Sequence, residues 1–357
     1  MSLRVTVVGC GAIGLGCAAL LQTLGHRVSL WSPRAASREV FAGAGGGISA
    51  EGVVQAEFQP KLANSPSEAA DAEVLLVTIP ANGAAGLIDA LAPVVRSGQA
   101  VWWTPVASAS ALLLHEAAKA RGVDLLSIAS PTTVVTGRRT SPGRVRVMTV
   151  RKRLDVAALP AARAAEALDI ARKLFGERFD LLPDVLAASL APINPVAHVP
   201  LMLANLTRAE LGETWGVYRH MTPAVSRIIE SLDAERLAVA RAFGYALPSI
   251  HEHFVRSFGV APGPLECIAR EIVALRNGGP DAPAALETRF IAEDAPYGLA
   301  FIQALGRIPN ISTPATDGAM ALAATIWGAD TATRNPLVER LALRGSTVLQ
   351  LRERAAG

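Results

Sequence analysis

A glycine-rich turn near the start of the chain has residue types and spacing suited to holding phosphate groups. It reads Gly9-Cys10-Gly11-Ala12-Ile13-Gly14 and directly follows an apolar run, where a helical pattern begins. In such a turn the first glycine allows a tight bend, the second lets the backbone approach a pyrophosphate, and the third lets a helix pack on a strand. Backbone N–H groups at the helix start attract anionic oxygens. We therefore expect Gly9, Gly11, Ala12, Ile13 and Gly14 to bind a dinucleotide; the alternative is a glycine-rich turn without a ligand.

The residues that end the next apolar run indicate which nicotinamide coenzyme is used. A carboxylate at this place hydrogen-bonds the ribose 2′-hydroxyl of NAD(H) and repels a 2′-phosphate. The sequence has no acid here and reads Trp31-Ser32-Pro33-Arg34, with Arg38 one helical turn further on. We expect Ser32 and Arg34 to bind the coenzyme, which favours NADP(H) over NAD(H). The alternative is that Arg34 is a solvated surface residue.

A proline follows the third expected strand. Thr78-Ile79-Pro80 closes the apolar run that starts at Val74. Loops at the carboxyl ends of parallel strands form the ligand crevice of such sheets. We expect Pro80 to lie beside the nicotinamide, although an ordinary turn proline explains the residue equally well.

These residues need a parallel sheet to position them, and the first half of the chain has the pattern of one. Short β-branched runs alternate with longer helical patterns, which is typical of βαβ units, and after Pro183 helical periodicity takes over. We predict an α/β protein: a Rossmann domain with a doubly wound parallel sheet over residues 1–183, followed by an all-α domain over residues 184–357. The expected strands are Arg4–Val8, Arg27–Trp31, Val74–Ile79, Ala100–Thr104, Leu125–Ile128, Val145–Val150 and Phe179–Leu182. The expected helices are Leu159–Phe175, Pro195–Leu211, Pro223–Phe243, Ile250–Phe258, Pro264–Leu275, Gly298–Leu305 and Pro314–Gly328.

The composition excludes several classes of protein. Lys and Arg number 34 against 31 acids, and the longest basic cluster is Arg151–Arg153, so no nucleic-acid partner is expected. Cys10, Cys17 and Cys267 have no C-x-x-C spacing, which argues against disulfides and zinc and fits the cytoplasm. No apolar stretch is expected to reach the roughly 18 residues of a membrane span. We predict no metal and no membrane contact; the apolar C-terminal helices leave room for a homodimer surface.

Two further segments carry a family resemblance. Residues 193–200 read Ile-Asn-Pro-Val-Ala-His-Val-Pro, and residues 289–298 read Arg-Phe-Ile-Ala-Glu-Asp-Ala-Pro-Tyr-Gly. In both, the sequence resembles the octopine/nopaline (opine) dehydrogenase family, and the resemblance spans nearly the whole chain. It implies a Rossmann domain joined to an α-helical domain and a reductive condensation of an amino acid with a 2-keto acid by NAD(P)H. The product would be a secondary amine dicarboxylate.

The resemblance makes His198 the catalytic acid/base and Asp294 its carboxylate partner. Both lie in matching segments, N-P-x-x-H-x-P and R-x-x-x-E-D. A carboxylate beside an imidazole fixes its tautomer and stabilises its protonated form, and dehydration of a carbinolamine needs such a proton donor. Without the resemblance, a histidine among Leu, Met and Pro is more often structural. The other histidines lack this context and are expected to be structural or surface residues: His26, His115, His220, His251 and His253.

The resemblance also implies substrate-binding residues. Arg289 belongs to the second segment and is expected to bind a coenzyme phosphate or a substrate carboxylate, with a structural ion pair as the alternative. Helical spacing, rather than the resemblance, adds Asn205: it follows His198 by nearly two turns and is expected to face the same site. Thr132 and Thr133 follow a strand where family members hold the keto acid, and their hydroxyls are expected to donate to its carboxylate.

One loop departs from the family, and two other functions stay open. The family often has a Pro-Gly pattern where this chain reads Thr104-Pro105-Val106, which indicates a different amino acid or keto acid. A 2-keto acid reductase resembling ketopantoate reductase is the alternative enzyme. It relies on a lysine, and the second half of the chain has none. The third interpretation is a nucleotide-sensing module without chemistry.

Overall fold

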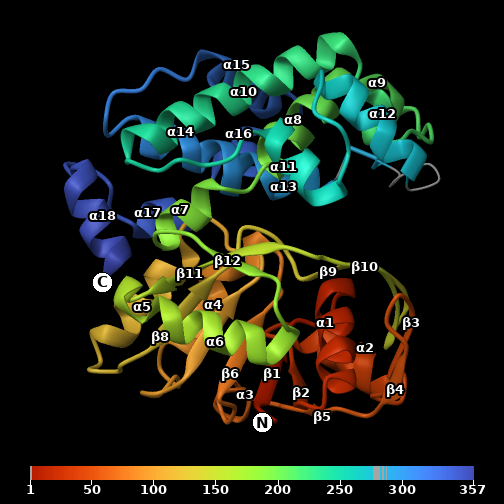
Figure 1. Ribbon diagram of the computed structural model, residues 1–357, viewed down its shortest axis with the longest axis vertical. Coiled ribbons are helices and arrows are strands. Elements are labelled where there is room, and N and C mark those ends of the chain that lie inside the picture. Colours follow the sequence, from red (N-terminus) through yellow and green to blue (C-terminus); the bar gives the residue numbers. More distant parts are fainter. Residues whose placement is uncertain (1, 276–281, 284, 287) are drawn as a thin grey trace. The chain divides into compact units, whose positions relative to one another are not determined.

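The computed structural model, which describes residues 2–275, 282–283, 285–286 and 288–357, pairs the apolar runs of the first half into an eight-stranded sheet (Figure 1). The strand order is β12-β11-β8-β7-β6-β1-β2-β5, which confirms the predicted Rossmann-type arrangement. The central strands β6, β7 and β8 are buried along their whole length, as unbroken apolar runs predict. The strands are β1 (Arg4–Val8), β2 (Arg27–Trp31), β5 (Lys61–Leu62), β6 (Val74–Val77), β7 (Ala100–Trp103), β8 (Leu126–Ala129), β11 (Leu154–Leu159) and β12 (Phe179–Leu181).

Strand β1 lies at the topological switch point of this sheet. It pairs in parallel with β2 on one side and with β6 on the other. The order of the strands therefore reverses at β1, with β2 on one side and β6 on the other. Ligands of such sheets bind at the carboxyl ends of the strands at this point. The glycine turn follows β1, Ser32 follows β2 and Thr78 follows β6. All three thus lie at the edge where a dinucleotide is expected.

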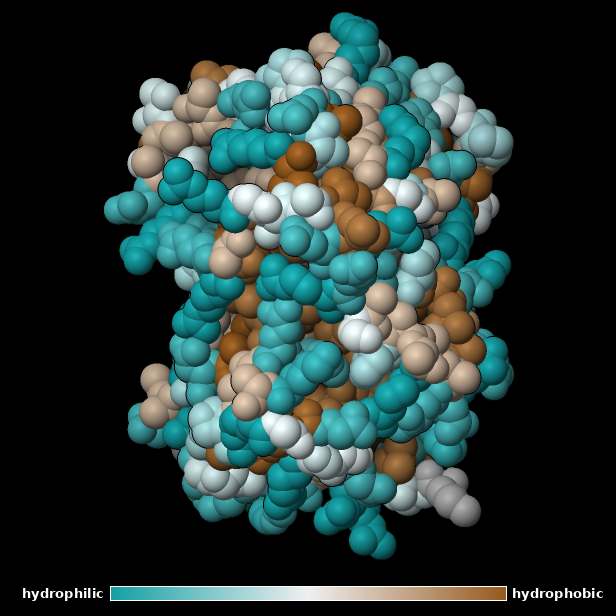
Figure 2. Space-filling view, turned by 90° about the vertical axis from the view of Figure 1, so that its left-hand side faces the viewer, coloured by the Kyte–Doolittle hydropathy of each residue, from teal (hydrophilic) through white to brown (hydrophobic). Residues whose placement is uncertain are grey.

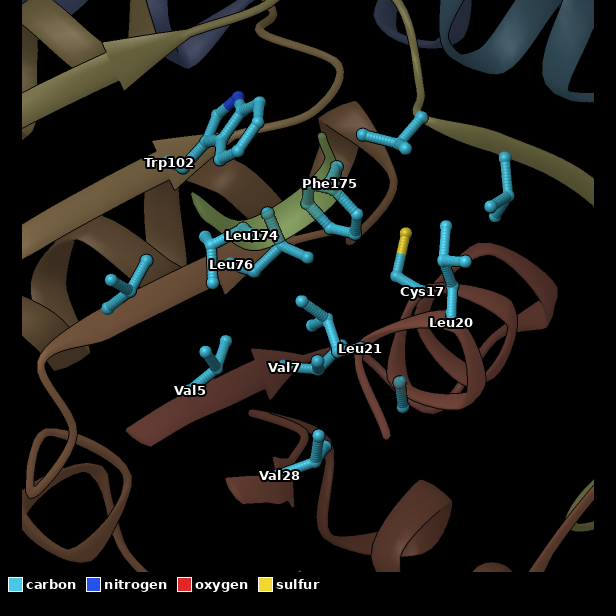
Figure 3. Close-up of a cluster of buried hydrophobic side chains, with 14 of the residues drawn as sticks. Val5, Val7, Cys17, Leu20, Leu21, Val28, Leu76, Trp102, Leu174 and Phe175 are labelled. Atoms are coloured by element: carbon cyan, nitrogen blue, oxygen red, sulfur yellow. The ribbon is translucent and has the colours of Figure 1, made fainter. Parts of the chain in front are cut away.

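Helices α1 (Ala12–Thr23) and α6 (Ala164–Phe175) contribute apolar side chains to the core of the sheet. Figure 3 shows Leu21 of α1 beside Val7 of β1. The rings of Trp102 and Phe175 meet edge to face with centroids 5.5 Å apart. Each such buried side chain contributes about 1.5–3 kcal/mol, so this core fixes α1 against β1. The other helices of this half are α2 (Ala35–Gly43), α3 (Pro66–Ala69), η1 (Ala81–Gly83), α4 (Ala84–Leu91), α5 (Ser110–Lys119), η2 (Ala161–Arg163) and α7 (Val185–Leu190).

A second, four-stranded sheet packs on α1, and the sequence did not predict it. It consists of β3 (Ile48–Gly52), β4 (Ala56–Phe58), β9 (Val135–Ser141) and β10 (Arg144–Val150), in the order β4-β3-β10-β9. The expected strand Val145–Val150 is real, but its place in the main sheet was wrong. The reason is a hairpin: Gly143 has φ +73°, and the turn sends β10 back antiparallel to β9.

The expected helix Leu159–Phe175 begins later than predicted. Residues Leu154–Leu159 form β11, which pairs antiparallel with β8, and α6 starts only at Ala164. The run from Leu154 reads Leu-Asp-Val-Ala-Ala-Leu, and all of its residues except Asp155 are buried, as expected for a strand inside the sheet. An apolar run of this length has no periodicity that separates a buried strand from a helix.

The second half of the chain is helical in every element that the described residues form, which confirms the predicted all-α region. Helix α10 (Pro223–Ala242) packs against α8 (Asn194–Ala204), α14 (Ala300–Gly306) and α15 (Pro314–Trp327). The remaining elements are α9 (Leu206–Glu210), η3 (Tyr218–His220), α11 (Ile250–Phe258), α12 (Leu265–Leu275), α13 (Arg289–Ala292), the π-helix η4 (Ala295–Leu299), α16 (Ala329–Thr333) and α17 (Pro336–Arg340).

A buried ion pair within α10 ties neighbouring segments together. Arg236 is fully buried and donates to Asp233 Oδ1, to the carbonyl of Leu190 and to the carbonyl of Pro248. Asp233 Oδ2 in turn accepts from the backbone N–H of Ile250, the first residue of α11. Because breaking a buried pair leaves an uncompensated charge, this network specifies where α11 and the segment before α8 meet α10.

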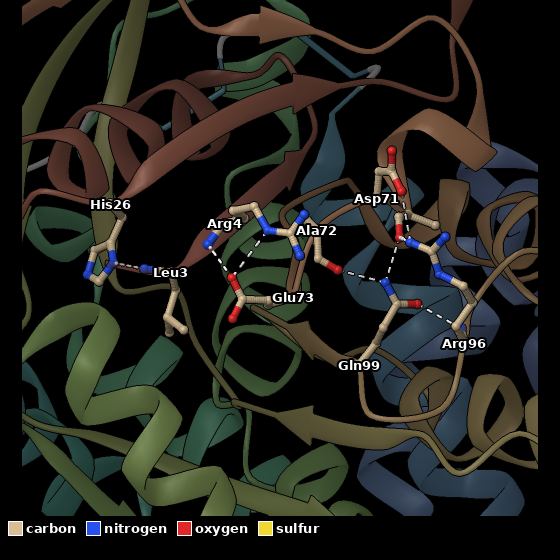
Figure 4. Close-up of polar contacts among 9 residues, drawn as sticks. Leu3, Arg4, His26, Asp71, Ala72, Glu73, Arg96 and Gln99 are labelled. Carbon is tan, nitrogen blue, oxygen red and sulfur yellow. Dashed lines mark hydrogen bonds and ion pairs between the residues drawn. The ribbon is translucent and has the colours of Figure 1, made fainter. Parts of the chain in front are cut away.

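The amino-terminal edge of the main sheet is closed by polar contacts (Figure 4). Glu73, just before β6, accepts from the backbone N–H of Arg4 at 3.0 Å. Gln99, just before β7, donates to the carbonyls of Ala70 and Ala72. His26, just before β2, accepts at Nδ1 from the backbone N–H of Leu3. These contacts satisfy polar groups of this edge within the protein.

The chain divides into two compact units. Unit 1 comprises Met1–Ser189 and Arg352–Gly357, and unit 2 comprises Leu190–Leu351. The last helix, α18 (Val348–Ala356), brings Arg354 to Glu116 of α5, with Nε–Oε1 and Nη2–Oε2 distances of 2.7 and 3.0 Å. The functional division at residue 183 stays a prediction. The residues at the end of the chain contact unit 1 more than unit 2 and therefore belong to unit 1.

One stretch is long and apolar enough to cross a membrane, contrary to the expectation from the sequence. Residues Val185–Ala204 have a mean hydropathy of 1.4, but 83% of this window is buried inside the protein. The stretch contains α7 and α8, and its burial is that of a core segment. Hydrophilic side chains cover much of the face shown in Figure 2.

Candidate active site

The glycine turn has the geometry of a phosphate cradle. Gly9 has φ +130°, a value that favours glycine, and its N–H donates to the carbonyl of Trp31 at 2.7 Å. A Cβ on Gly14 would lie 1.9 Å from the carbonyl oxygen of Gly9, so α1 approaches β1 more closely than any side chain allows. A Cβ on Gly11 would meet nothing within 4 Å. The backbone at Gly11 is therefore open to a ligand, and these residues fit a dinucleotide pyrophosphate.

The start of α1 supplies the donors for that ligand. Gly11 is the N-cap, and no side chain caps the helix. The half-buried Ala12 and Ile13 form its first turn, where backbone N–H groups have no partner within a helix. Thr78, at the end of β6, donates from Oγ1 to the carbonyl of Val8 and so fixes the neighbouring strand end. An anion placed here would meet N–H groups and the positive end of the helix dipole.

The end of β2 carries the residues expected to distinguish the coenzymes. Ser32 is buried, and its carbonyl accepts from Arg38 Nη1. Arg34 is exposed and serves as the N-cap residue of α2. Because Arg34 and Arg38 are four residues apart at the start of α2, they lie on the same side of the helix. Two arginines, and no acid, thus follow the end of β2 as far as Arg38.

His198 and Asp294 are hydrogen-bonded, as the two sequence segments led us to expect. The distance from His198 Nδ1 to Asp294 Oδ2 is 2.8 Å, and the side chains are 13% and 16% exposed. A carboxylate only accepts, so Nδ1 carries the hydrogen and Nε2 is the nitrogen left for proton exchange. Partial exposure leaves this nitrogen within reach of a small molecule. The pair lies entirely within unit 2.

Phe290 completes the surroundings of the imidazole. Its ring lies parallel to that of His198, with centroids 3.8 Å apart and an interplanar angle of 4°. Asp294 therefore fixes the rotation of the imidazole in its plane, while Phe290 covers one face. Phe290 was not predicted as a site residue, although it lies in the same R-x-x-x-E-D segment. The available signal was an aromatic residue next to a catalytic motif.

A close contact between α8 and η4 brings the two segments together. A Cβ on Gly298 would lie 2.1 Å from Pro195 Cγ, so only glycine lets the proline pack there. Asn335 Nδ2 also donates to the carbonyl of Pro296 at 2.8 Å, which adds a second contact to η4. A π-helix widens one turn, and such turns are frequent at functional sites. This contact explains the presence of a proline in the first segment and of a glycine in the second.

The other expected site residues differ in whether their polar side-chain groups already form hydrogen bonds within the protein. Thr133 Oγ1 donates to the carbonyl of Val135 at 2.7 Å, so its hydroxyl hydrogen is already used. Asn205 is buried at the end of α8, and its Nδ2 donates to the carbonyl of Leu201. Arg289 is exposed at the first position of α13.

Thr132 and Pro80 lie at the carboxyl ends of β8 and β6. The carbonyl of Thr132 accepts from Thr104 Oγ1 at 3.0 Å, which ties the loop after β8 to the end of β7. Pro80 is exposed and precedes η1. Both residues therefore lie at the carboxyl edge of the sheet, where ligands of such sheets bind.

The remaining histidines make structural contacts. His26 bridges the backbone of Leu3 and of Lys173, and burial lowers its pKa. His251 pairs with Glu230 at 3.0 Å outside the site. Among the described residues, no group of three or more His, Cys, Asp or Glu side chains is arranged to hold a metal ion.

Comparisons with known proteins match both halves of the chain. A family model described as NAD/NADP octopine/nopaline dehydrogenase, alpha-helical domain, matches residues 181–327, and one described as ketopantoate reductase PanE/ApbA matches residues 5–160. The opine dehydrogenase of Arthrobacter sp. (strain 1C) is 30% identical over 350 residues, which covers 97% of each chain.

Solved structures of low sequence identity share the fold. Octopine dehydrogenase in complex with NADH and agmatine aligns with a TM-score of 0.79 and 17% identity, covering 100% of this chain and 98% of that one. Its complex with NADH and pyruvate gives 0.77 and 18%, covering 98% of each chain. Yersinopine dehydrogenase with bound NADP⁺ gives 0.70 and 15%, covering 99% of each chain.

Proposed function

The chain belongs to the opine dehydrogenase family, and from that premise we propose that it catalyses the reversible, NAD(P)H-dependent reductive condensation of an amino acid with a 2-keto acid. The observation that carries this proposal is the His198–Asp294 hydrogen bond, formed between the two segments that resemble the family. The open glycine turn in unit 1 supports the nucleotide requirement.

When bound, the nicotinamide coenzyme would supply the hydride that reduces the imine carbon. The protein's part is to bind it, and the residues proposed for this are Gly9, Gly11, Ala12, Ile13 and Gly14 at the pyrophosphate. Pro80, at the end of β6, is proposed to lie beside the nicotinamide. The backbone of Gly11 and the uncapped start of α1 suit two phosphates, because both offer N–H donors without a competing side chain.

His198 is the proposed proton donor and acceptor. Condensation of an amine with a ketone gives a carbinolamine, and its loss of water needs a proton delivered to the leaving hydroxyl. The Nε2 atom of His198 delivers that proton and recovers one in the reverse direction. Asp294 stabilises the imidazolium that is present before this proton is delivered and that forms again in the reverse direction.

NADP(H) is the proposed preferred coenzyme. The end of β2 has Ser32 and Arg34 where a carboxylate would repel a 2′-phosphate. Among the structural relatives, octopine dehydrogenase is described with NADH and yersinopine dehydrogenase with NADP⁺, so the preference has to be read from this chain's own residues.

Substrate carboxylates are proposed to bind Arg289 and Thr132, with Asn205 and Thr133 contributing less. Arg289 offers a planar fork of N–H donors that matches a carboxylate. The hydroxyl of Thr133 and the amide of Asn205 already donate within the protein. Octopine dehydrogenase has been described with pyruvate, which is the class of keto acid that we propose here.

The alternative, a reductase like ketopantoate reductase, rests on the family model that matches residues 5–160. That match is confined to the nucleotide-binding half. No lysine occurs in the chain after Lys173, so unit 2 has no candidate for a catalytic lysine. For the site of action we propose the cytoplasm, because Cys10, Cys17 and Cys267 are all free thiols.

A substrate panel with two histidine variants tests the proposal. Amino acids are paired with pyruvate or 2-oxoglutarate, and consumption of NADPH and NADH is followed by absorbance. With the active pair, we expect His198→Gln to lower kcat by about 10²-fold to 10⁴-fold, since general acid–base catalysis contributes that much. Coenzyme affinity, measured by fluorescence titration, should stay unchanged.

The matched control is His251→Gln, which breaks a second His–carboxylate pair within unit 2, with Glu230. Its kcat should stay within a few-fold of the wild type. If no substrate pair consumes either coenzyme, the proposed reaction is wrong. If His198→Gln turns over as fast as the control variant, the proposed acid/base is wrong.

A further inference from the structure

Arg139 lies on β9, on the face that packs against α1. A Cβ on Gly16 of α1 would lie 3.0 Å from Val135 Cγ2, so Val135 points to the helix. The register of β9 on β10 shifts between Thr136 and Gly137, but Gly137 pairs with Val147, whose Cγ2 would lie 3.5 Å from the same Cβ on Gly16. From Gly137 to Arg139 the register is regular, and side chains alternate between the two faces of a strand. Arg139 is therefore on the side of α1, whereas Arg138 is on the other side. Figure 1 shows β9 beside α1.

The glycine turn lies within the field of two guanidinium groups. Burial raises the pKa of the Cys10 thiol to about 11, and the positive charges of Arg38 and Arg139 both oppose this rise. The turn is also joined to the end of β2, because the N–H of Gly9 donates to the carbonyl of Trp31. Arg38 from α2 and Arg139 from β9 thus both act on the charge of Cys10 in the turn before α1, although they come from elements far apart in the sequence.

Both guanidinium groups have donors left for an anion. Arg38 uses Nη1 on the carbonyl of Ser32, and a guanidinium has five N–H donors in all. Within the described part of the chain, Arg139 forms no ion pair. On the opposite face of the same sheet, Arg146 has Glu51 at 4.0 Å as a counter-charge. Arg139, by contrast, keeps its guanidinium group available on the α1 side.

We propose that Arg139 binds the 2′-phosphate of NADP(H) together with Arg38, and so selects the coenzyme from the second sheet. The proposal rests on the proposed NADP(H) preference. Arg38 is held at the end of β2, where the ribose 2′ position is recognised, which favours this phosphate over the pyrophosphate. Two guanidinium groups from different elements suit a phosphate, because each can form charge-assisted, bidentate hydrogen bonds.

Dissociation constants for NADPH and NADH, measured by fluorescence titration without substrate, test this role. The variants are Arg139→Gln, Arg139→Lys and the matched control Arg138→Gln, which removes the same charge from the opposite face of β9. We expect Arg139→Gln to weaken NADPH binding by about tenfold or more, the usual size for a lost charge-assisted hydrogen bond. NADH binding should change little, and Arg139→Lys should lose less than Arg139→Gln.

The outcomes separate this proposal from the function on which it rests. A wild type that binds NADH more tightly than NADPH contradicts the coenzyme preference itself. If the wild type prefers NADPH and Arg139→Gln keeps the same preference, Arg139 does not bind the 2′-phosphate. Equal losses for both coenzymes, or an equal loss in Arg138→Gln, overturn it as well, since these indicate the pyrophosphate or the net charge.

Discussion

At the scale of single residues, two neighbouring side chains fix the position of the His198 imidazole. Asp294 accepts from its Nδ1, and Phe290 lies flat against one face of its ring. A hydrogen bond alone lets the imidazole rock about the N–H···O axis, and an aromatic ring stacked on it limits this motion. Reaction rates depend steeply on such alignment, because an error of about 1 Å in placement can cost about 10²-fold in rate.

Replacing Phe290 by leucine should therefore lower kcat more than it changes KM. A stacked pair contributes about 0.5–1.5 kcal/mol beyond its burial, which corresponds to about twofold to tenfold in rate. Phe290→Tyr keeps the ring and should retain most of the activity. Steady-state kinetics of both variants, with the thermal midpoint measured alongside, gives the comparison.

The control for lost packing is Ile291→Ala, which shortens a buried side chain of α13 and leaves all aromatic rings in place. It should lower the thermal midpoint with less effect on kcat. Equal slowing by Phe290→Leu and Ile291→Ala would show that Phe290 only fills space.

Sequence reasoning named both partners of the hydrogen bond but not the stacked ring. His198 and Asp294 stood in recognisable segments, whereas the stack depends on how α13 meets α8, which no local pattern encodes. The hydroxyl of Thr133 was expected to be free for substrate. Its bond to Val135 is a local contact of the kind that threonines form in turns, and it competes with any ligand.

At the scale of secondary-structure elements, the close packing of α8 against η4 sets the geometry of the site. Pro195 occupies the space where any other residue at position 298 would have a side chain. Both residues are small or rigid, and each belongs to one of the two motifs. The contact thus sets the spacing between the helix that carries His198 and the turn that carries Asp294.

Gly298→Ala should separate these two elements. The added Cβ would lie 2.1 Å from Pro195 Cγ, so the backbone must shift. We expect a loss of about 10²-fold in kcat from misalignment and about 1–3 kcal/mol in the free energy of unfolding. Activity assays and denaturant titration measure the two effects.

Gly318→Ala is the matched control, since a Cβ there meets nothing within 4 Å and Gly318 lies in α15 of the same unit. It should keep full activity and gain about 0.5–1 kcal/mol, because alanine favours a helix over glycine. A Gly298→Ala enzyme as active as this control would contradict the role of the Pro195 contact.

Most helices and apolar strands could be predicted from periodicity, whereas strands that are very short or mostly polar could not. Helix α11 and strands β1 and β2 have the predicted bounds because clear apolar runs or caps define them. Strand β4 has three residues, and β9 reads Val-Thr-Gly-Arg-Arg-Thr-Ser, a sequence that is mostly polar. Their stability comes from pairing with neighbours and packing on α1, which are long-range contacts.

At the scale of the whole molecule, buried histidines link stability to pH. His26 accepts from one backbone N–H and donates to one carbonyl, so its neutral form fits both partners. Burial lowers the pKa of His26 and also that of His115. Below the ordinary histidine pKa of about 6.5, the unfolded chain takes up protons that the folded chain does not, so acidification favours unfolding.

We expect the free energy of unfolding to fall between pH 7.5 and pH 5.5, and His26→Gln to reduce this fall. Glutamine can accept and donate as His26 does, but it does not titrate. Part of the dependence should remain because of His115. Denaturant titrations at both pH values test this, and an unchanged pH dependence in the variant would contradict the role of His26.

The return of Arg352–Gly357 to unit 1 makes the helical unit an insertion in the nucleotide-binding unit rather than an appendage to it. A gene truncated after Ser189 would encode unit 1 without its last six residues, leaving Glu116 without Arg354 and an open site where Ala355 is buried. To express the nucleotide-binding half alone, one should splice residues 352–357 back through a short flexible linker.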